Sequence, residues 1–159
     1  GYPDRMSRED PTIISKMFEQ KWFGKKNEKG FYIHSKDKKG KPKKELNPET
    51  ANFVRELNAS SGNDISDENI VERMMLPMLM ESSRCLEDNI VETPMEVDMG
   101  LIYGLGFPPF RGGIFRWADS AGLDVLLQSS EKLESSGKLY EPTEQIRKMV
   151  KDGQLFHPI

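Results

Sequence analysis

Four glycines and two prolines fall within the ten residues Gly104–Gly113, together with Leu105, Phe107 and Phe110. Glycine and proline interrupt regular helices and strands, whereas flexible linkers carry few large apolar side chains. The combination predicts a rigid, buried turn between two helices. This turn constrains the fold more than any other part of the chain, because few turns combine glycine and proline with large apolar side chains.

Helix signals dominate the rest of the chain, so the predicted class is all-α. Apolar residues recur at helical spacing, and a capping residue or a proline marks most of the expected starts. The expected helices begin near Asp10-Pro11, Asn47-Pro48, Ser66 or Asp67, Thr93-Pro94, Ile114, Leu123 and Pro142. The longest extends to about Asn89 and contains Pro77, which is expected to kink it.

Residues 34–46 consist mostly of Lys, Asp, Ser and Gly, and they are expected to form an exposed loop. A solvated linker is the favoured interpretation of this lysine cluster, because such tracts often bind nothing specific. An anion-binding patch is the other interpretation.

Composition excludes several classes of protein. The net charge of -3 argues against a nucleic-acid surface, and no apolar run approaches the roughly 20 residues that span a bilayer. The first residues lack a signal peptide and an initiating Met, so the chain is expected to be cut from a longer one. Cys85 is the single cysteine, which excludes internal disulfides and fits a reducing compartment. No common zinc-site spacing is present.

The other candidate residues have simple structural interpretations. His34 and His157 are expected to be surface histidines, because neither has a carboxylate at a spacing that indicates a dyad. Cys85 is expected to be packed or half-buried. For Arg111 and Arg116, contact with the phosphates of a ligand and pairing with carboxylates both remain open.

An internal similarity indicates a repeat. Residues 14–23 and 146–155 share Ile, Lys and Met at matching places, followed by a charged residue and a late large apolar one. A Tyr and a Pro lie upstream of both segments. Spacing alone does not distinguish a repeat from a chance likeness of two amphipathic helices.

Several motifs occur in a fixed order along the chain. They are Gly24-Lys25-Lys26-Asn27-x-Lys29-Gly30-Phe31-Tyr32, Thr93-Pro94-x-Glu96-x-Asp98, Gly104-Leu-Gly-Phe-Pro-Pro-Phe and Trp117-Ala-Asp119-x-x-Gly122-Leu123-Asp124. Together they resemble the C-terminal helical domain of 3-hydroxyacyl-CoA dehydrogenases. The form with Phe-Pro-Pro-Phe-x-Gly-Gly most resembles the second copy in bacterial fatty acid oxidation complex α-subunits. The structural signature residues are Gly30, Pro77, Gly104, Gly106, Phe107, Pro108, Pro109, Gly112 and Gly113.

The resemblance implies a parent enzyme of fatty acid β-oxidation that combines NAD-dependent L-3-hydroxyacyl-CoA dehydrogenase and enoyl-CoA hydratase activities. In the active helical repeat of this family, an Asn before an Arg-x-x-x-Pro segment positions the acyl substrate. Glu72 occupies that place here, before Arg73 and Pro77. An anionic side chain would repel thioester and phosphate groups, so this copy is expected to be structural. No catalytic, cofactor-binding or metal residue is expected in this chain, and no Gly-x-Gly-x-x-Gly motif follows a strand.

The resemblance also implies a division of the chain. Residues 1–33 are expected to be the tail of the first helical repeat, 34–65 a linker with one helix, and 66–159 the complete second repeat. The second repeat would replace the partner subunit of single-function relatives, as an intramolecular pseudo-dimer partner.

The implied partners are the Rossmann, crotonase-like and first helical domains of the parent chain and the thiolase β-subunit, in the bacterial cytoplasm. The chain alone is expected to self-associate, because removal of a partner domain exposes apolar surface. Two alternatives remain open. One is a stand-alone helical adaptor that binds a partner through the Met-rich helix 67–89. The other is residual CoA affinity through Lys25, Lys26 and Lys29.

Overall fold

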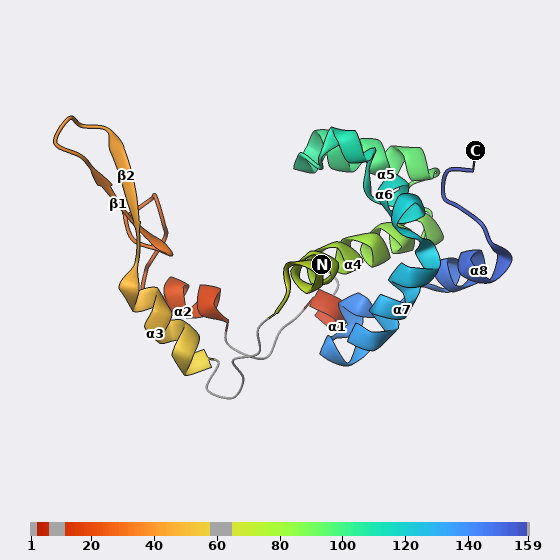
Figure 1. The fold of residues 1–159 in the computed structure, drawn as a ribbon, viewed down its shortest axis with the longest axis horizontal. Coiled ribbons are helices and arrows are strands. Elements are labelled where there is room, and N and C mark those ends of the chain that lie inside the picture. The colour runs from red at the N-terminus through yellow and green to blue at the C-terminus, as the bar shows by residue number, and fades with distance from the viewer. Residues whose placement is uncertain (1–2, 7–11, 58–64, 159) are drawn as a thin grey trace. The chain divides into compact units, whose positions relative to one another are not determined.

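The computed structural model describes residues 3–6, 12–57 and 65–158 (Figure 1). The chain divides into two compact units. Unit 1 contains residues 1–7 and 65–159, and unit 2 contains residues 8–64, so unit 2 is inserted into the sequence of unit 1. The expected division after residue 33 falls inside a strand, and residues 8–33 of the expected tail lie in unit 2 together with residues 34–64 of the expected linker.

Unit 2 contains helix α2 (Ile13–Glu19), strands β1 (Tyr32–Lys36) and β2 (Pro42–Leu46), and helix α3 (Pro48–Leu57). Thr12 caps α2; the expected cap, Asp10, lies outside the described residues. Asn47 was correctly predicted to open α3: its side chain accepts the Glu49 N–H and donates to the Gly30 carbonyl. The helix is thereby joined to the turn before β1.

The two strands form an antiparallel hairpin, so the expectation of a loop over residues 34–46 is wrong. The Asp37 carboxylate accepts the N–H groups of Lys39 and Lys41, and Gly40 adopts a positive φ of 76°. These contacts close a tight turn. Both faces of the ribbon are largely exposed, and a strand without a buried face shows no apolar alternation in its sequence.

Unit 1 is helical. Its elements are α1 (Pro3–Met6), α4 (Asp67–Glu87), α5 (Pro94–Gly100), the π-helix η1 (Leu101–Leu105), η2 (Pro109–Arg111), α6 (Ile114–Ala121), α7 (Leu123–Leu133), η3 (Glu134–Ser136), η4 (Lys138–Tyr140) and α8 (Glu144–Asp152). Helix α4 is central and contacts α6, α7, α8 and η4. The fully buried apolar residues are Leu76, Leu79, Met80, Ile114, Phe115, Ala118 and Ile146.

The caps of unit 1 follow the local sequence. Ser66 caps α4, and Thr93 and Glu96 form the predicted capping box of α5. Helix α4 continues through Pro77. The sequence predicts that α8 begins at Pro142. The helix instead begins at Glu144, one residue after its cap Thr143.

Helices α2 and α8 lie in different units but share a threonine N-cap and one closing hydrogen bond. Both have a threonine N-cap: Thr12 and Thr143. After α2, the Trp22 N–H bonds to the Met17 carbonyl at 2.8 Å, and after α8 the Gln154 N–H bonds to the Met149 carbonyl at 2.8 Å. The similarity of the two segments therefore extends from sequence to backbone hydrogen bonds.

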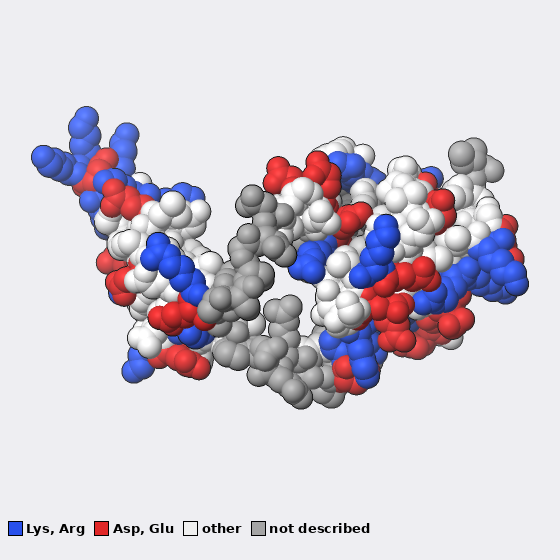
Figure 2. Space-filling model, turned by 60° about the horizontal axis from the view of Figure 1, so that its bottom comes forward, with Lys and Arg blue, Asp and Glu red and all other residues white. Residues whose placement is uncertain are grey.

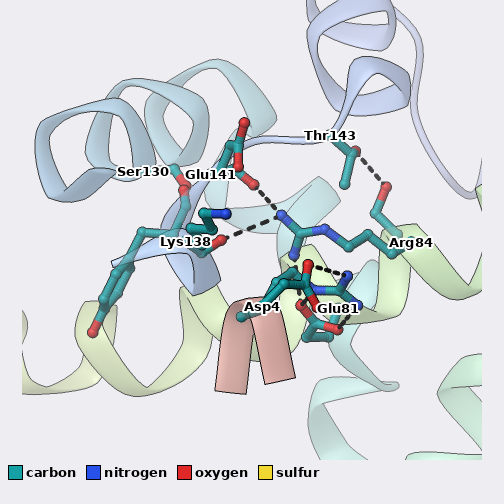
Figure 3. Close-up of polar contacts among 10 residues, drawn as sticks. Asp4, Glu81, Arg84, Ser130, Lys138, Glu141 and Thr143 are labelled. Atoms are coloured by element: carbon teal, nitrogen blue, oxygen red, sulfur yellow. Dashed lines mark hydrogen bonds and ion pairs between the residues drawn. The ribbon is translucent and has the colours of Figure 1, made fainter. Parts of the chain in front are cut away.

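An arginine on α4 holds the turn that precedes α8 (Figure 3). The Arg84 guanidinium donates to the carbonyls of Glu141 (2.7 Å) and Lys138 (3.5 Å), and to the Glu81 carboxylate (2.7 Å). Arg5 of α1 makes two further bonds to Glu81, of 2.9 and 3.0 Å. One carboxylate thus joins α1 and α4 through two charge-assisted contacts.

Cys85 follows Arg84 on α4 and is half-buried, as predicted. Burial raises the pKa of its thiol, and the nearby carboxylates of Glu81 and Asp88 raise it further. Both effects disfavour the thiolate in the folded chain.

We expect alkylation of Cys85 by iodoacetamide to reach its half-maximal rate at a higher pH in the folded chain than in the urea-unfolded chain. Because the folded-state pKa is raised, the stability contributed by the neutral thiol is present below about pH 8.5 and is lost as the pH rises above it. The unfolded chain is the matched control. An equal or lower midpoint in the folded chain would contradict the raised pKa.

Candidate functional site

The glycine-rich segment 104–113 is only partly buried, which corrects the expectation of a buried turn. Phe107 packs into the core, whereas Tyr103, Leu105 and Phe110 are 79%, 74% and 84% exposed. The end of η1 and the whole of η2 lie in the segment, and residues 106–108 separate them. Of the two phenylalanines in the segment, only Phe107 anchors the turn in the core.

The signature glycines and prolines have distinct places. Gly106 and Gly112 have φ values of 73° and 76°, which favour glycine. Pro108 precedes η2 and Pro109 is its first residue. In unit 2, a Cβ on Gly30 would lie 2.9 Å from the Gly24 Cα, so the backbones there approach too closely for a side chain.

Asp98 lies at the centre of the turn. It projects from α5 and is 3% exposed. Its carboxylate accepts the backbone N–H groups of Phe115 (2.9 Å) and Arg116 (3.3 Å) in the first turn of α6. Gly113, the residue at the N-cap position of α6, has no side chain, so Asp98 supplies the cap from another helix.

The position of Asp98 requires glycine at residue 113. A Cβ built on Gly113 would overlap the Asp98 carboxyl group, and Gly113 also has a φ of 107°. Steric overlap and backbone conformation therefore exclude a side chain independently.

The C-terminal segment completes the cluster. The Asp119 carboxylate on α6 accepts the N–H groups of Phe156 and His157, each at 2.9 Å. His157 Nε2 lies 2.8 Å from Asp98 Oδ2, and the Phe156 ring stacks on Phe115 with centroids 4.0 Å apart. We call these five residues, Asp98, Phe115, Asp119, Phe156 and His157, the aspartate clamp.

The prediction that His157 is a surface residue is wrong. Its side chain is only 17% exposed and contacts a buried carboxylate. Asp98 and His157 are 59 residues apart, so no local spacing indicated the pair. His34 lies on β1 and is half-buried.

The polar groups of the clamp bond to one another and to the backbone. Its two carboxylates accept four backbone N–H groups and contact an imidazole, all from the chain itself. Among the described residues, every buried side-chain N or O atom has a partner. The same residues contain no group of three or more His, Cys, Asp or Glu side chains that could hold a metal ion.

Glu72 is half-buried and has a bonding partner within unit 1. Its carboxylate accepts a hydrogen bond from the Ser129 hydroxyl of α7 at 2.9 Å. Arg116 contacts Asp98 through its backbone, and the Arg111 guanidinium lies 5.4 Å from the Phe110 ring centroid.

The remaining candidates are the methionines and the lysines. Met75, Met78 and Met80 belong to the core or pack against it. Lys29 pairs with Glu49 at 2.8 Å and lies over the Trp22 ring. No helix in the described ranges is long and apolar enough to cross a membrane.

Replacement of Gly113 by Ala is expected to destabilise unit 1 by about 3 kcal/mol or more, because both its Cβ and its φ are incompatible with the clamp. Gly104→Ala is the matched control. A Cβ at Gly104 meets no atom within 4 Å, so alanine there should stabilise η1 by about 0.5–1 kcal/mol. Urea unfolding of both variants measures the difference, and equal effects would contradict the steric argument.

Asp98 and His157 should contribute unequally to the free energy of unfolding of unit 1. Asp98→Ala leaves two backbone N–H groups of α6 without a partner and is expected to cost about 2–4 kcal/mol, whereas His157→Ala should cost about 1 kcal/mol. The double variant should be less destabilised than the sum of the single effects, because the two side chains share one contact. Strict additivity in thermal or urea unfolding would show that the pair is not coupled.

Comparison with known proteins places these features in a family. The model for the 3-hydroxyacyl-CoA dehydrogenase C-terminal domain matches residues 70–157, which include the whole clamp. The fatty acid oxidation complex subunits alpha of Pseudomonas paraeruginosa and Pseudomonas aeruginosa are each 47% identical over 156 residues. The match covers 98% of this chain and 22% of each relative, so the chain spans about a fifth of their length.

A solved structure agrees with this comparison. The dehydrogenase part of multifunctional enzyme 1 from C. elegans matches with a TM-score of 0.63 and 25% identity, over 89% of this chain and 33% of that one. The predicted resemblance and the helical fold class are thus confirmed. The chain belongs to the family of 3-hydroxyacyl-CoA dehydrogenase C-terminal domains.

Proposed function

We propose that the chain is a structural, non-catalytic part of a multifunctional fatty acid β-oxidation enzyme. The parent reaction is hydride transfer between L-3-hydroxyacyl-CoA and NAD, combined with hydration of enoyl-CoA. The family and the names of the relatives support this assignment. The observation that carries the non-catalytic role is the aspartate clamp, whose carboxylates are engaged by backbone N–H groups of the chain itself.

The described residues do not fit NAD. A dinucleotide site of the Rossmann type needs a parallel βαβ unit whose glycine-rich turn follows a strand. The two described strands instead form an antiparallel hairpin in unit 2, and the glycine-rich segment 104–113 follows the π-helix η1. NAD is therefore assigned to the parent enzyme, and no catalytic step is assigned to residues of this chain.

Residues 66–159 are proposed to be the second helical repeat, and unit 2 is proposed to contain the tail of the first. The matching caps and closing bonds of α2 and α8 support this relationship. In this arrangement the second repeat acts as an intramolecular pseudo-dimer partner of the first. Glu72 fits the structural role because its carboxylate is bonded to Ser129 within the repeat.

The proposed partners are the Rossmann, crotonase-like and first helical domains of the parent chain, and a thiolase β-subunit, in the bacterial cytoplasm. The relatives are named as alpha subunits of a complex, which supports assembly with other subunits. The exposed side chains of Tyr103, Leu105 and Phe110 supply apolar surface for such contacts, or for self-association of the isolated chain. The adaptor alternative uses the same helix: Met80 is buried in the core of unit 1 and Met75 and Met78 pack against it, whereas Met74 is 70% exposed and is available for a contact.

The isolated 159-residue chain is expected to show no oxidation of NADH with acetoacetyl-CoA above the rate without protein. The physical reason is that residues 3–6, 12–57 and 65–158 form no dinucleotide site of the Rossmann type, and the clamp carboxylates are engaged by backbone N–H groups. The change in absorbance of NADH measures the reaction, and a full-length Pseudomonas relative is the positive control. Turnover that scales with the concentration of this chain would disprove the non-catalytic role.

A further inference from the structure

Helix α1 precedes unit 2 in the sequence but belongs to unit 1, where it contacts η4. It has only four residues, whereas isolated helices shorter than about 12 residues are marginal in water. Its helical structure therefore depends on contacts with the rest of unit 1. Two of these contacts are the hydrogen bonds from the Arg5 guanidinium to the Glu81 carboxylate of α4, between residues 76 positions apart.

The contact between Arg5 and Glu81 is shielded from solvent. The side chains of Arg5, Glu81 and Arg84 are 16%, 21% and 15% exposed. Figure 2 shows acidic and basic side chains beside one another on the surface of unit 1, and exposed pairs of this kind contribute little to stability. A shielded contact in which two nitrogens of one arginine meet both oxygens of a carboxylate restricts both partners more strongly. Arg5 therefore holds the Glu81 carboxylate in one orientation.

The same carboxylate positions Arg84. Glu81 Oε1 accepts a hydrogen bond from Arg84 Nη1 at 2.7 Å, one turn further along α4. Arg84 Nη2 donates to the carbonyl of Glu141 at 2.7 Å and to that of Lys138 at 3.5 Å (Figure 3). Because a guanidinium is planar and rigid, fixing one nitrogen restricts the direction in which the other donates. The orientation of Glu81 is thereby passed to the turn 138–141.

The turn 138–141 leads directly to the cap of α8. Thr143 follows the turn, and its hydroxyl oxygen accepts the Ile146 N–H at 3.2 Å. The hydroxyl of Ser83, the residue before Arg84 on α4, lies 2.7 Å from the Thr143 hydroxyl oxygen. Two adjacent residues of α4 therefore hold the turn and the cap with which α8 begins.

We propose that Arg5, Glu81 and Arg84 form a latch through which docking of α1 orders the turn and the cap at the start of α8. Arg5 is a positioning residue in this latch, because it acts on the turn through Glu81 and Arg84. Under the proposed function, α1 precedes the tail of the first helical repeat and belongs to that repeat. The statement that the latch lets the first repeat order the second rests on that function, whereas the latch itself rests on the contacts within unit 1.

Hydrogen exchange of the full 159-residue chain, followed by mass spectrometry, tests the latch. Arg5→Ala should raise the exchange rate of amides in residues 138–147 by roughly fivefold or more, because Arg84 is no longer held in one orientation. Exchange in α6, which the aspartate clamp holds, should change by less than about twofold. Asp4→Ala is the matched control: Asp4 lies on the same helix and pairs with Arg5 at 3.6 Å, but it makes no bond in the latch. Equal exchange in Arg5→Ala and the unaltered chain would overturn the proposal.

Arg84→Ala distinguishes the latch from a direct effect of α1 on η4. This variant should raise exchange in residues 138–147 at least as much as Arg5→Ala. Adding Arg5→Ala to it should then have less than about a twofold further effect, because the path through Arg84 is already broken. Effects of the two substitutions that multiply would reject the latch.

Arg5→Lys keeps the charge but loses the two-pronged contact, so it should raise exchange less than Arg5→Ala, and it serves as the test if the alanine variant fails to fold. Circular dichroism confirms that each variant is folded. An effect of the lysine variant equal to that of Asp4→Ala would contradict the role of Arg5. None of these measurements depends on catalysis: turnover of acetoacetyl-CoA by the chain would disprove the proposed function and leave the latch intact.

Discussion

The buried carboxylate of Asp98 is the contact on which much of unit 1 depends. It supplies the N-cap of α6 from α5 and meets His157 of the C-terminal segment, so one side chain joins three parts of the unit. Such a carboxylate is stable at 3% exposure because donors surround it. Gly113 is a consequence of the same contact, since any side chain there would occupy the place of the carboxyl group.

Other polar side chains in unit 1 also bond to backbone groups or to neighbouring helices. Asp119 holds the backbone of the C-terminal segment, Arg84 binds the carbonyls of the turn before α8, and Glu72 accepts a bond from α7. Short helices leave many backbone groups without an intrahelical partner, and buried ones must be satisfied. The conspicuous motifs of this unit are thus explained by the geometry of helix ends, which agrees with a structural role.

Unit 2 distributes its residues differently. Its hairpin buries little, and its lysines lie on exposed strands and in the turn between them. Asn47 and Gly30 hold the turn before β1 and helix α3, through one side-chain bond and one close backbone contact. Unit 1 thus contains a polar network bonded within the unit, whereas the strands of unit 2 leave most of their side chains exposed.

Local sequence determined the helical class, the family resemblance, and the caps at Ser66, Thr93 and Asn47, because a cap involves residues within one helical turn. Tertiary structure alone decided the partner of His157, which lies 59 residues from Asp98, and the exposure of most of the glycine-rich segment. It also decided the hairpin: lysine-rich strands exposed on both faces carry no alternating pattern, so their pairing follows from turn closure and register. Contacts between distant residues depend on how helices and strands pack, and spacing along the chain does not encode that packing.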